Sequence, residues 1–245
     1  MGDAIHNSTG LNVLCVKWGD KYHADDVNRL QAMIAEHLTL PHRFYCYTDD
    51  PEGARADIIP IAVDNRLTVW WNKLALFQRG FGGLEGRMLF LDLDVVVQRN
   101  IDDLVWYHPQ GLTCVEAFWK GPQAINTVNY NMNINSSVMT WNAGECGAIW
   151  NHFAAHETEM LERYIGMDRF LFHEGFELRH WPRGWIYSRL NGIDLRPFYY
   201  SYRKHLHCEV FSFPETRICL LNGVWTMPPE KEREFRPKRG LQHHR

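Results

Sequence analysis

The sequence lacks the marks of several protein classes. Its 245 residues contain no run of about 20 apolar residues, so no transmembrane helix is expected. No two of its six cysteines are close enough to form a Cys-x-x-Cys pair for zinc or redox chemistry. Walker A, Gly-x-Gly-x-x-Gly and Gly-x-Ser-x-Gly motifs are also absent. Their absence argues against P-loop ATPases, dinucleotide-binding enzymes and serine hydrolases.

The chain has little net charge. Its 26 Lys and Arg against 29 Asp and Glu give a formal charge of −3, so no global positive field would attract nucleic acid, and no nucleic-acid partner is expected. The exception is residues 228–245, a charged and locally basic tail for which we expect at most weak contact with a membrane surface. The first ten residues lack the apolar core of a signal peptide, which favours a cytoplasmic location.

The pattern of apolar residues predicts an α/β fold. Strands are expected at 11–18, 42–48, 57–64, 87–97, 111–118, 134–141 and 216–221. Helices are expected at 24–38, 70–79 and within 145–175. The alternation indicates one domain over 1–227, with a mainly parallel central sheet flanked by helices and an irregular C-terminal third. Four cysteines, Cys15, Cys46, Cys114 and Cys219, lie in apolar runs and are expected to be buried.

The segment RMLFLDLDVVV (87–97) is the strongest strand signal and contains Asp92 and Asp94. Charges within such an apolar run are costly unless they are paired or bound to a metal. In open α/β sheets, ligands bind outside the carboxyl ends of the strands. Two carboxylates separated by one residue suit a hard divalent cation, which could bridge a diphosphate and neutralise a leaving phosphate. The alternative is an ordinary strand end, at which an Asp caps a turn.

The segment FLDLDVVV (90–97) resembles the Asp-x-Asp strand of GT-A-fold glycosyltransferases, most closely family 8 and its bacterial relatives. Four other segments resemble motifs of that family in the family's order: WWNKLALF (70–77), NSSVMTWNAG (135–144), GMDRFL (166–171) and LLNGVW (220–225). The resemblance covers about residues 11–228. It implies a GT-A-like domain whose Asp92 and Asp94 hold Mn²⁺ or Mg²⁺ on the diphosphate of a nucleotide-sugar donor.

The resemblance also implies roles for further residues. Lys73 would contact the phosphate or sugar of the donor, and Asn135 and Ser136 would face the donor sugar. Asp168 would bind sugar hydroxyls near the reaction centre or serve as a catalytic carboxylate. The chain departs from the family at Asn222, which stands where a metal-binding His is usual, and at Arg169, where Gln is common. Asn222 is therefore the expected third metal ligand.

The implied activity is the metal-dependent transfer of a hexose, with retention of configuration, from a UDP-sugar to a hydroxyl of a glycan or other acceptor. Two alternatives stay open. A degenerate GT-A domain would bind nucleotide sugar or glycan without turnover. A haloacid-dehalogenase-type phosphatase would use Asp92 as its nucleophile, although that motif normally continues with Gly-Thr, and Val95 and Val96 follow here.

Two further features bear on the site. The uncharged segment 123–133 is predicted to be a mobile loop that orders over the donor. Most of the chain's tryptophans are expected in the core, with one or two providing a flat platform for a sugar ring.

Overall fold

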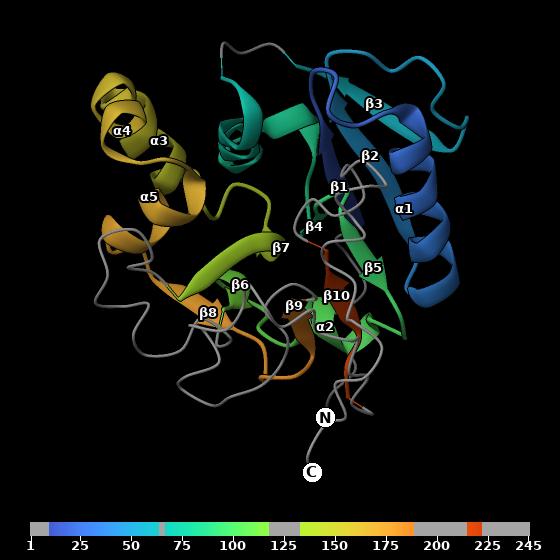
Figure 1. Cartoon of the computed structure of the whole chain (residues 1–245). Coiled ribbons are helices and arrows are strands. Elements are labelled where there is room, and N and C mark those ends of the chain that lie inside the picture. Colours follow the sequence, from blue (N-terminus) through green and yellow to red (C-terminus); the bar gives the residue numbers. More distant parts are fainter. Residues whose placement is uncertain (1–9, 64–66, 118–132, 189–214, 222–245) are drawn as a thin grey trace, which may run out of the picture.

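The computed structural model describes residues 10–63, 67–117, 133–188 and 215–221 (Figure 1). Its centre is a seven-stranded sheet with the order β3-β2-β1-β4-β7-β6-β8. The strands are β1 (Leu11–Lys17), β2 (His42–Thr48), β3 (Ile58–Ala62), β4 (Arg87–Leu91), β6 (Leu112–Glu116), β7 (Ile134–Asn142) and β8 (Leu178–His180). Four of its six strand pairings are parallel, which confirms the predicted α/β class with a mainly parallel sheet.

The first half of the sheet follows the predicted alternation of strands and helices. Helix α1 (Ala24–His37) connects the parallel strands β1 and β2 and covers one face of the sheet (Figure 1). Its buried side chains Val27, Leu30 and Ile34 recur at helical spacing. The Asp26 carboxylate accepts the backbone N–H of His23 at 2.9 Å, which supplies a partner at the N-terminal end of the helix.

Strand β4 lies at the middle of the sheet, and its side chains divide between two cores. Leu89 and Leu91 belong to the core beneath α1, whereas Met88 and Phe90 belong to the core on the opposite face. A strand covered on both faces needs an uninterrupted apolar run, which explains the composition of this segment.

The prediction of one strand over 87–97 is wrong. The chain turns at residues 92–94, and β5 (Val95–Val97) belongs to a second, three-stranded sheet with the order β5-β10-β9. The other strands of that sheet are β9 (Ile186–Ser188) and β10 (Ile218–Leu220). The break follows from the partners: β4 pairs with β7, whereas Val95 and Val97 pair with β10.

The face of the sheet opposite α1 is covered by η1 (Val69–Phe77), α3 (Gly147–Ala155), α4 (Glu157–Arg163) and α5 (Met167–His173) (Figure 1). The helix predicted at 70–79 is thus a 3₁₀ helix, and it is followed, as predicted, by a glycine, Gly80, with a φ of 73°. Helices within 145–175 are confirmed. Strands β8 and β9 occur where irregular chain was predicted.

A buried arginine joins β4 to the short helix α2 (Asp102–Trp106). The fully buried Arg87 donates hydrogen bonds to the carbonyl oxygen of Val105 at 2.9 Å, to that of His108 at 2.7 Å and to the Thr140 hydroxyl at 2.8 Å. Burial lowers the pKa of Arg87 to about 10, which leaves the guanidinium charged at neutral pH. Arg87 therefore supplies hydrogen-bond donors to the end of α2, where carbonyls lack helical partners.

The other predictions about the core are confirmed where the structure describes them. Cys15, Cys46, Cys114 and Cys219 are buried free thiols. The tryptophan prediction is confirmed for Trp71, Trp141 and Trp181, which are buried, whereas Trp70 is exposed and the other described tryptophans are partly buried. Within the described ranges, no helix has the length and apolar character needed to cross a bilayer.

Candidate active site

The topology gathers polar side chains at one edge of the main sheet. Successive strands run outward from β1 through β2 to β3, and β4 then pairs on the other side of β1, so the order reverses there. Ligands bind at such switch points, outside the carboxyl ends of the strands. Asp92 follows β4 directly at this edge. The antiparallel pairing of Leu91 with Val138 brings the first residues of β7 beside Asp92, and the Asp92 N–H donates to the carbonyl oxygen of Ser137 at 2.8 Å.

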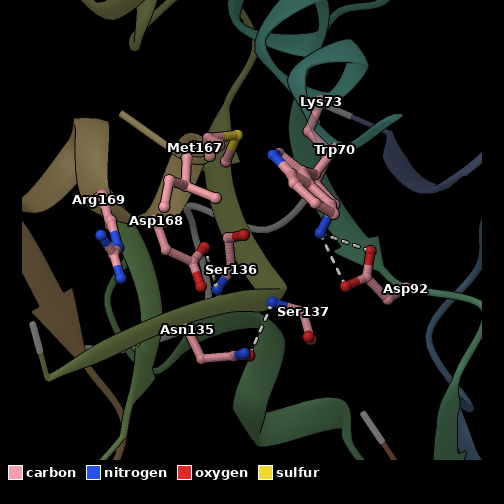
Figure 2. Close-up of a pocket in the computed structure, with 11 residues that line it drawn as sticks. Trp70, Lys73, Asp92, Asn135, Ser136, Ser137, Met167, Asp168 and Arg169 are labelled. Atoms are coloured by element: carbon pink, nitrogen blue, oxygen red, sulfur yellow. Dashed lines mark hydrogen bonds and ion pairs between the residues drawn. The ribbon is translucent and has the colours of Figure 1, made fainter. Parts of the chain in front are cut away.

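A pocket of about 310 Å³ lies at this edge (Figure 2). It is lined by residues from η1, the end of β4, the start of β7 and the segment leading into α5: Trp70, Lys73, Asp92, Asn135, Ser136, Ser137, Ile165, Gly166, Met167, Asp168 and Arg169. Five residues singled out from the sequence, Lys73, Asp92, Asn135, Ser136 and Asp168, therefore share one cavity.

Lys73 and Asp92 form the strongest polar contact of the pocket. The Lys73 ammonium lies 2.7 Å from each carboxylate oxygen of Asp92 (Figure 2). The exposed fractions of the side chains are 11% for Lys73 and 22% for Asp92, so both charges are largely withdrawn from water. In this state each group is the counter-ion of the other.

Burial dominates the electrostatics of Asp92. Withdrawal from water and the nearby Asp94 raise the pKa of Asp92 to about 6, while the Lys73 ammonium and a hydrogen bond from Ser137 act in the opposite direction. Burial disfavours the charged form of a carboxyl group, and a neighbouring negative charge has the same effect. At neutral pH, Asp92 is therefore an ionised carboxylate held at an energetic cost, a state that a bound cation would relieve.

Asp94 lies outside the lining of the pocket but close to Asp92. It is buried, and its backbone oxygen accepts the N–H of Leu221 at 2.9 Å. Burial and the carboxylates of Asp94 and Asp92 raise the pKa of Tyr22 above its ordinary range. Tyr22, in the segment between β1 and α1, therefore lies within the electrostatic influence of both carboxylates.

The opposite side of the pocket is held by backbone contacts. The Asp168 carboxylate accepts the N–H of Ser136 at 3.1 Å through Oδ1, and the Asn135 amide oxygen accepts the N–H of Ser137 at 2.9 Å. These bonds hold the side chain of Asp168, from α5, and that of Asn135, from β7, against the backbone at the start of β7 (Figure 2). A second carboxylate oxygen of Asp168 and the amide nitrogen of Asn135 are then the groups that can meet a ligand.

Helix α5, which carries Asp168, is anchored by its far end. Glu174 follows α5 and accepts hydrogen bonds from the Tyr164 hydroxyl at 2.5 Å and from His152 at 2.7 Å. Arg163 lies 3.4 Å from the same carboxylate. The α3 and α4 contacts thus fix the position of the short helix that presents Asp168 to the pocket.

Other predicted elements of the site fall outside the described residues. These are Asn222, segment 123–132 of the predicted loop, and the tail over 228–245. In the described residues, no group of three or more His, Cys, Asp or Glu side chains could hold a metal ion. The metal role predicted for Asp92 and Asp94 therefore stays a prediction.

Six lining residues were not individually assigned a role from the sequence: Trp70, Ser137, Ile165, Gly166, Met167 and Arg169. A signal for Trp70 existed, because it precedes Lys73 by three residues and such residues share one side of a helix. Ile165 and Met167 carry no such signal.

With this geometry in place, comparison with known proteins identifies the fold. No protein-family model and no curated protein sequence matches the chain. Among solved structures, the galactosyltransferase LgtC in complex with donor and acceptor sugar analogues is similar at 13% identity, with 91% of this chain and 99% of that chain covered and a TM-score of 0.54. An active-site variant of LgtC is similar at 16% identity, with coverage of 91% and 93% and a TM-score of 0.54. The chain has a GT-A-like glycosyltransferase fold.

Proposed function

We propose that this protein is a metal-dependent glycosyltransferase. It transfers a hexose from a UDP-sugar to a hydroxyl of a glycan or other acceptor, with retention of anomeric configuration. The observation that carries the proposal is the pocket at the end of β4. There Asp92 and Lys73 lie together with Asn135, Ser136 and Asp168, on a GT-A-like fold. The five residues were singled out from the sequence for this activity, and they come from four segments of the chain.

The residues fit a hard divalent cation. Carboxylate oxygens are the preferred ligands of Mg²⁺ and suit Mn²⁺, and the neighbouring carboxylates of Asp92 and Asp94 would provide them. The cost of holding an ionised Asp92, seen in its raised pKa, is a second indication, because a cation would favour that ionised form. Asn222 would complete the protein's ligands. It directly follows Leu221, whose N–H is bonded to Asp94.

The bound metal would supply charge stabilisation for the diphosphate that leaves the donor sugar. Lys73 adds a point charge at the same place, since Asp92 holds its ammonium at the floor of the pocket. Asp168 and Asn135 orient the hexose through its hydroxyls from the other side. The Asp168 carboxylate would also stabilise positive charge at the anomeric carbon as the bond to phosphate breaks.

The test is turnover of UDP-sugars. Purified protein should release UDP from UDP-glucose or UDP-galactose in the presence of Mn²⁺ and should lose this activity with a chelator. Asp92→Asn and Asp94→Asn should each abolish metal-dependent donor binding while retaining the fold. Glu36→Gln, a change at an exposed acid of α1, is the matched control and should behave as wild type. Unchanged Mn²⁺-dependent turnover in both site variants would refute the assignment.

The same assay separates the alternatives. A degenerate GT-A domain would bind UDP-sugar in calorimetry without releasing UDP. A phosphatase would release phosphate from aryl phosphomonoesters and leave UDP-sugars intact. The GT-A-like fold and the Val95 and Val96 that follow the Asp-x-Asp segment, in place of Gly-Thr, favour the transferase over the phosphatase.

A further inference from the structure

The outer rim of the pocket carries two large apolar side chains that the proposed transfer of a hexose does not use. Trp70 is 48% exposed and Ile165 is 68% exposed. They are two of the five exposed large hydrophobic residues in the described part of the chain, and the other three do not line the pocket. Large apolar side chains that are exposed to solvent beside the same pocket are typical of a binding surface.

The local structure holds the indole of Trp70 at the pocket. Helix η1 has three residues per turn, so Trp70 stands one turn before Lys73 on the same side of the helix. Gly166, which also lines the pocket, closely approaches the edge of the ring. A Cβ atom on residue 166 would lie 2.6 Å from Nε1 of the indole, so any larger residue there would displace the ring.

The two sides of the pocket differ in chemistry. The rim at Trp70 and Ile165 is apolar, whereas Asn135, Ser136 and Asp168 offer amide, hydroxyl and carboxylate groups. A pyranose ring has the matching character, because one face presents C–H groups and the edge presents hydroxyls. Aromatic side chains bind such faces through apolar contact of a flat ring.

We propose that Trp70 is the platform for a pyranose ring of the acceptor, so that the acceptor of this enzyme is a glycan. The inference rests on the proposed glycosyltransferase function and names its acceptor class. The exposure of Trp70 assigns it to the acceptor rather than to the donor sugar. The donor diphosphate needs the charged groups at the floor, Lys73 and Asp92, which are largely buried. The acceptor arrives from solvent and meets the rim.

The experiment measures KM for donor and acceptor separately. The acceptor probes are fluorescent aryl glycosides of common hexoses and hexosamines, as mono- and disaccharides, with UDP-glucose or UDP-galactose and Mn²⁺. We expect Trp70→Ala to raise acceptor KM about tenfold, equivalent to ~1.4 kcal/mol, with donor KM within about twofold of wild type. Trp70→Phe should fall between the two, since it keeps a smaller flat ring. Gly166→Ala should also raise acceptor KM because it displaces the indole.

The matched control is Tyr107→Ala, which removes another exposed aromatic side chain, 44% exposed, outside the pocket. It should leave both KM values unchanged. A rise in donor KM alone on Trp70→Ala would overturn the proposal by placing the indole at the donor sugar, and unchanged KM values would overturn it outright. Transfer to a protein or lipid hydroxyl with no glycoside used would refute the acceptor class.

Failure of the proposed function has a different signature. Wild-type protein would then release no UDP with any glycoside or with water as acceptor. Fluorescence polarisation with the same tagged glycosides would still examine the platform. Binding by wild type that Trp70→Ala abolishes would support a glycan platform on a non-catalytic domain, and absence of binding would overturn the platform as well.

Discussion

Replacement of Asp92 by Asn should change how the stability of the metal-free protein depends on pH. Two effects oppose each other at this residue. Burial and Asp94 disfavour the ionised carboxylate, and the Lys73 ammonium at 2.7 Å favours it. The balance raises the pKa of Asp92 from its ordinary 3.8 to about 6. A shift of about two units corresponds to roughly 3 kcal/mol between the two protonation states.

The sign follows from proton linkage. The pKa of Asp92 is higher in the folded state than in the unfolded chain. Between about pH 4 and 6, the folded protein therefore keeps the Asp92 carboxyl protonated, whereas the unfolded chain has released that proton. Asp92 therefore adds stability at low pH that is lost as pH rises through about 6. The Asn variant has no such proton. The free energy of unfolding of Asp92→Asn minus that of wild type should thus rise by up to roughly 3 kcal/mol from pH 4 to pH 7.

The measurement is urea unfolding in chelator at several pH values. Other titrating groups are common to both proteins and cancel in the difference. Glu36→Gln, at an exposed position of α1, serves as the control and should give a nearly constant difference. Lys73→Met removes the group that lowers the pKa of Asp92, so its own loss of stability should continue above pH 6. A difference for Asp92→Asn that stays flat, or falls with rising pH, would show that the Lys73 contact outweighs burial and would refute this account.

Three other expectations concern separate parts of the chain. Arg87→Met should lower the free energy of unfolding by about 3 kcal/mol or more in urea titration, because three acceptors lose their donor at about 1 kcal/mol each; an unchanged midpoint would contradict the role given to this side chain. Asn222→His should tighten Mn²⁺ binding in the presence of UDP about fivefold to tenfold, or ~1 kcal/mol, and equal affinities by calorimetry would remove Asn222 from the metal site. UDP with Mn²⁺ should slow proteolysis within 123–133, whereas equal cleavage rates would argue against a loop that orders over the donor.

The elements of the first half could be predicted because the strands are short apolar runs and α1 has one clear helical period. The segment 87–97 shows the limit of that reasoning. Its apolar character continues across residues 92–94, but β4 and β5 pair with strands that come much later in the chain. No local pattern encodes that choice. Strands β8 and β9 have three residues each, which is too short for any period to appear.

The residues of the site could be predicted from the sequence better than their arrangement. Asp92, Lys73 and Asp168 could be singled out by residue type and motif order, and the structure brings them into one pocket. The contact between Lys73 and Asp92 could not be predicted, because it depends on how η1 packs against the end of β4. The exposure of Trp70 beside the buried Trp71 also depends on packing, since the two residues are alike in sequence.

Asp92 and Asp94 lie in the turn between β4 of the main sheet and β5 of the small sheet. The backbone of Asp92 is bonded to β7 of the main sheet, and that of Asp94 is bonded to Leu221, next to β10 of the small sheet. A cation shared by both carboxylates would act as a cross-link between the sheets. Substitutions within β10 should then alter metal affinity from a distance, by shifting one carboxylate relative to the other.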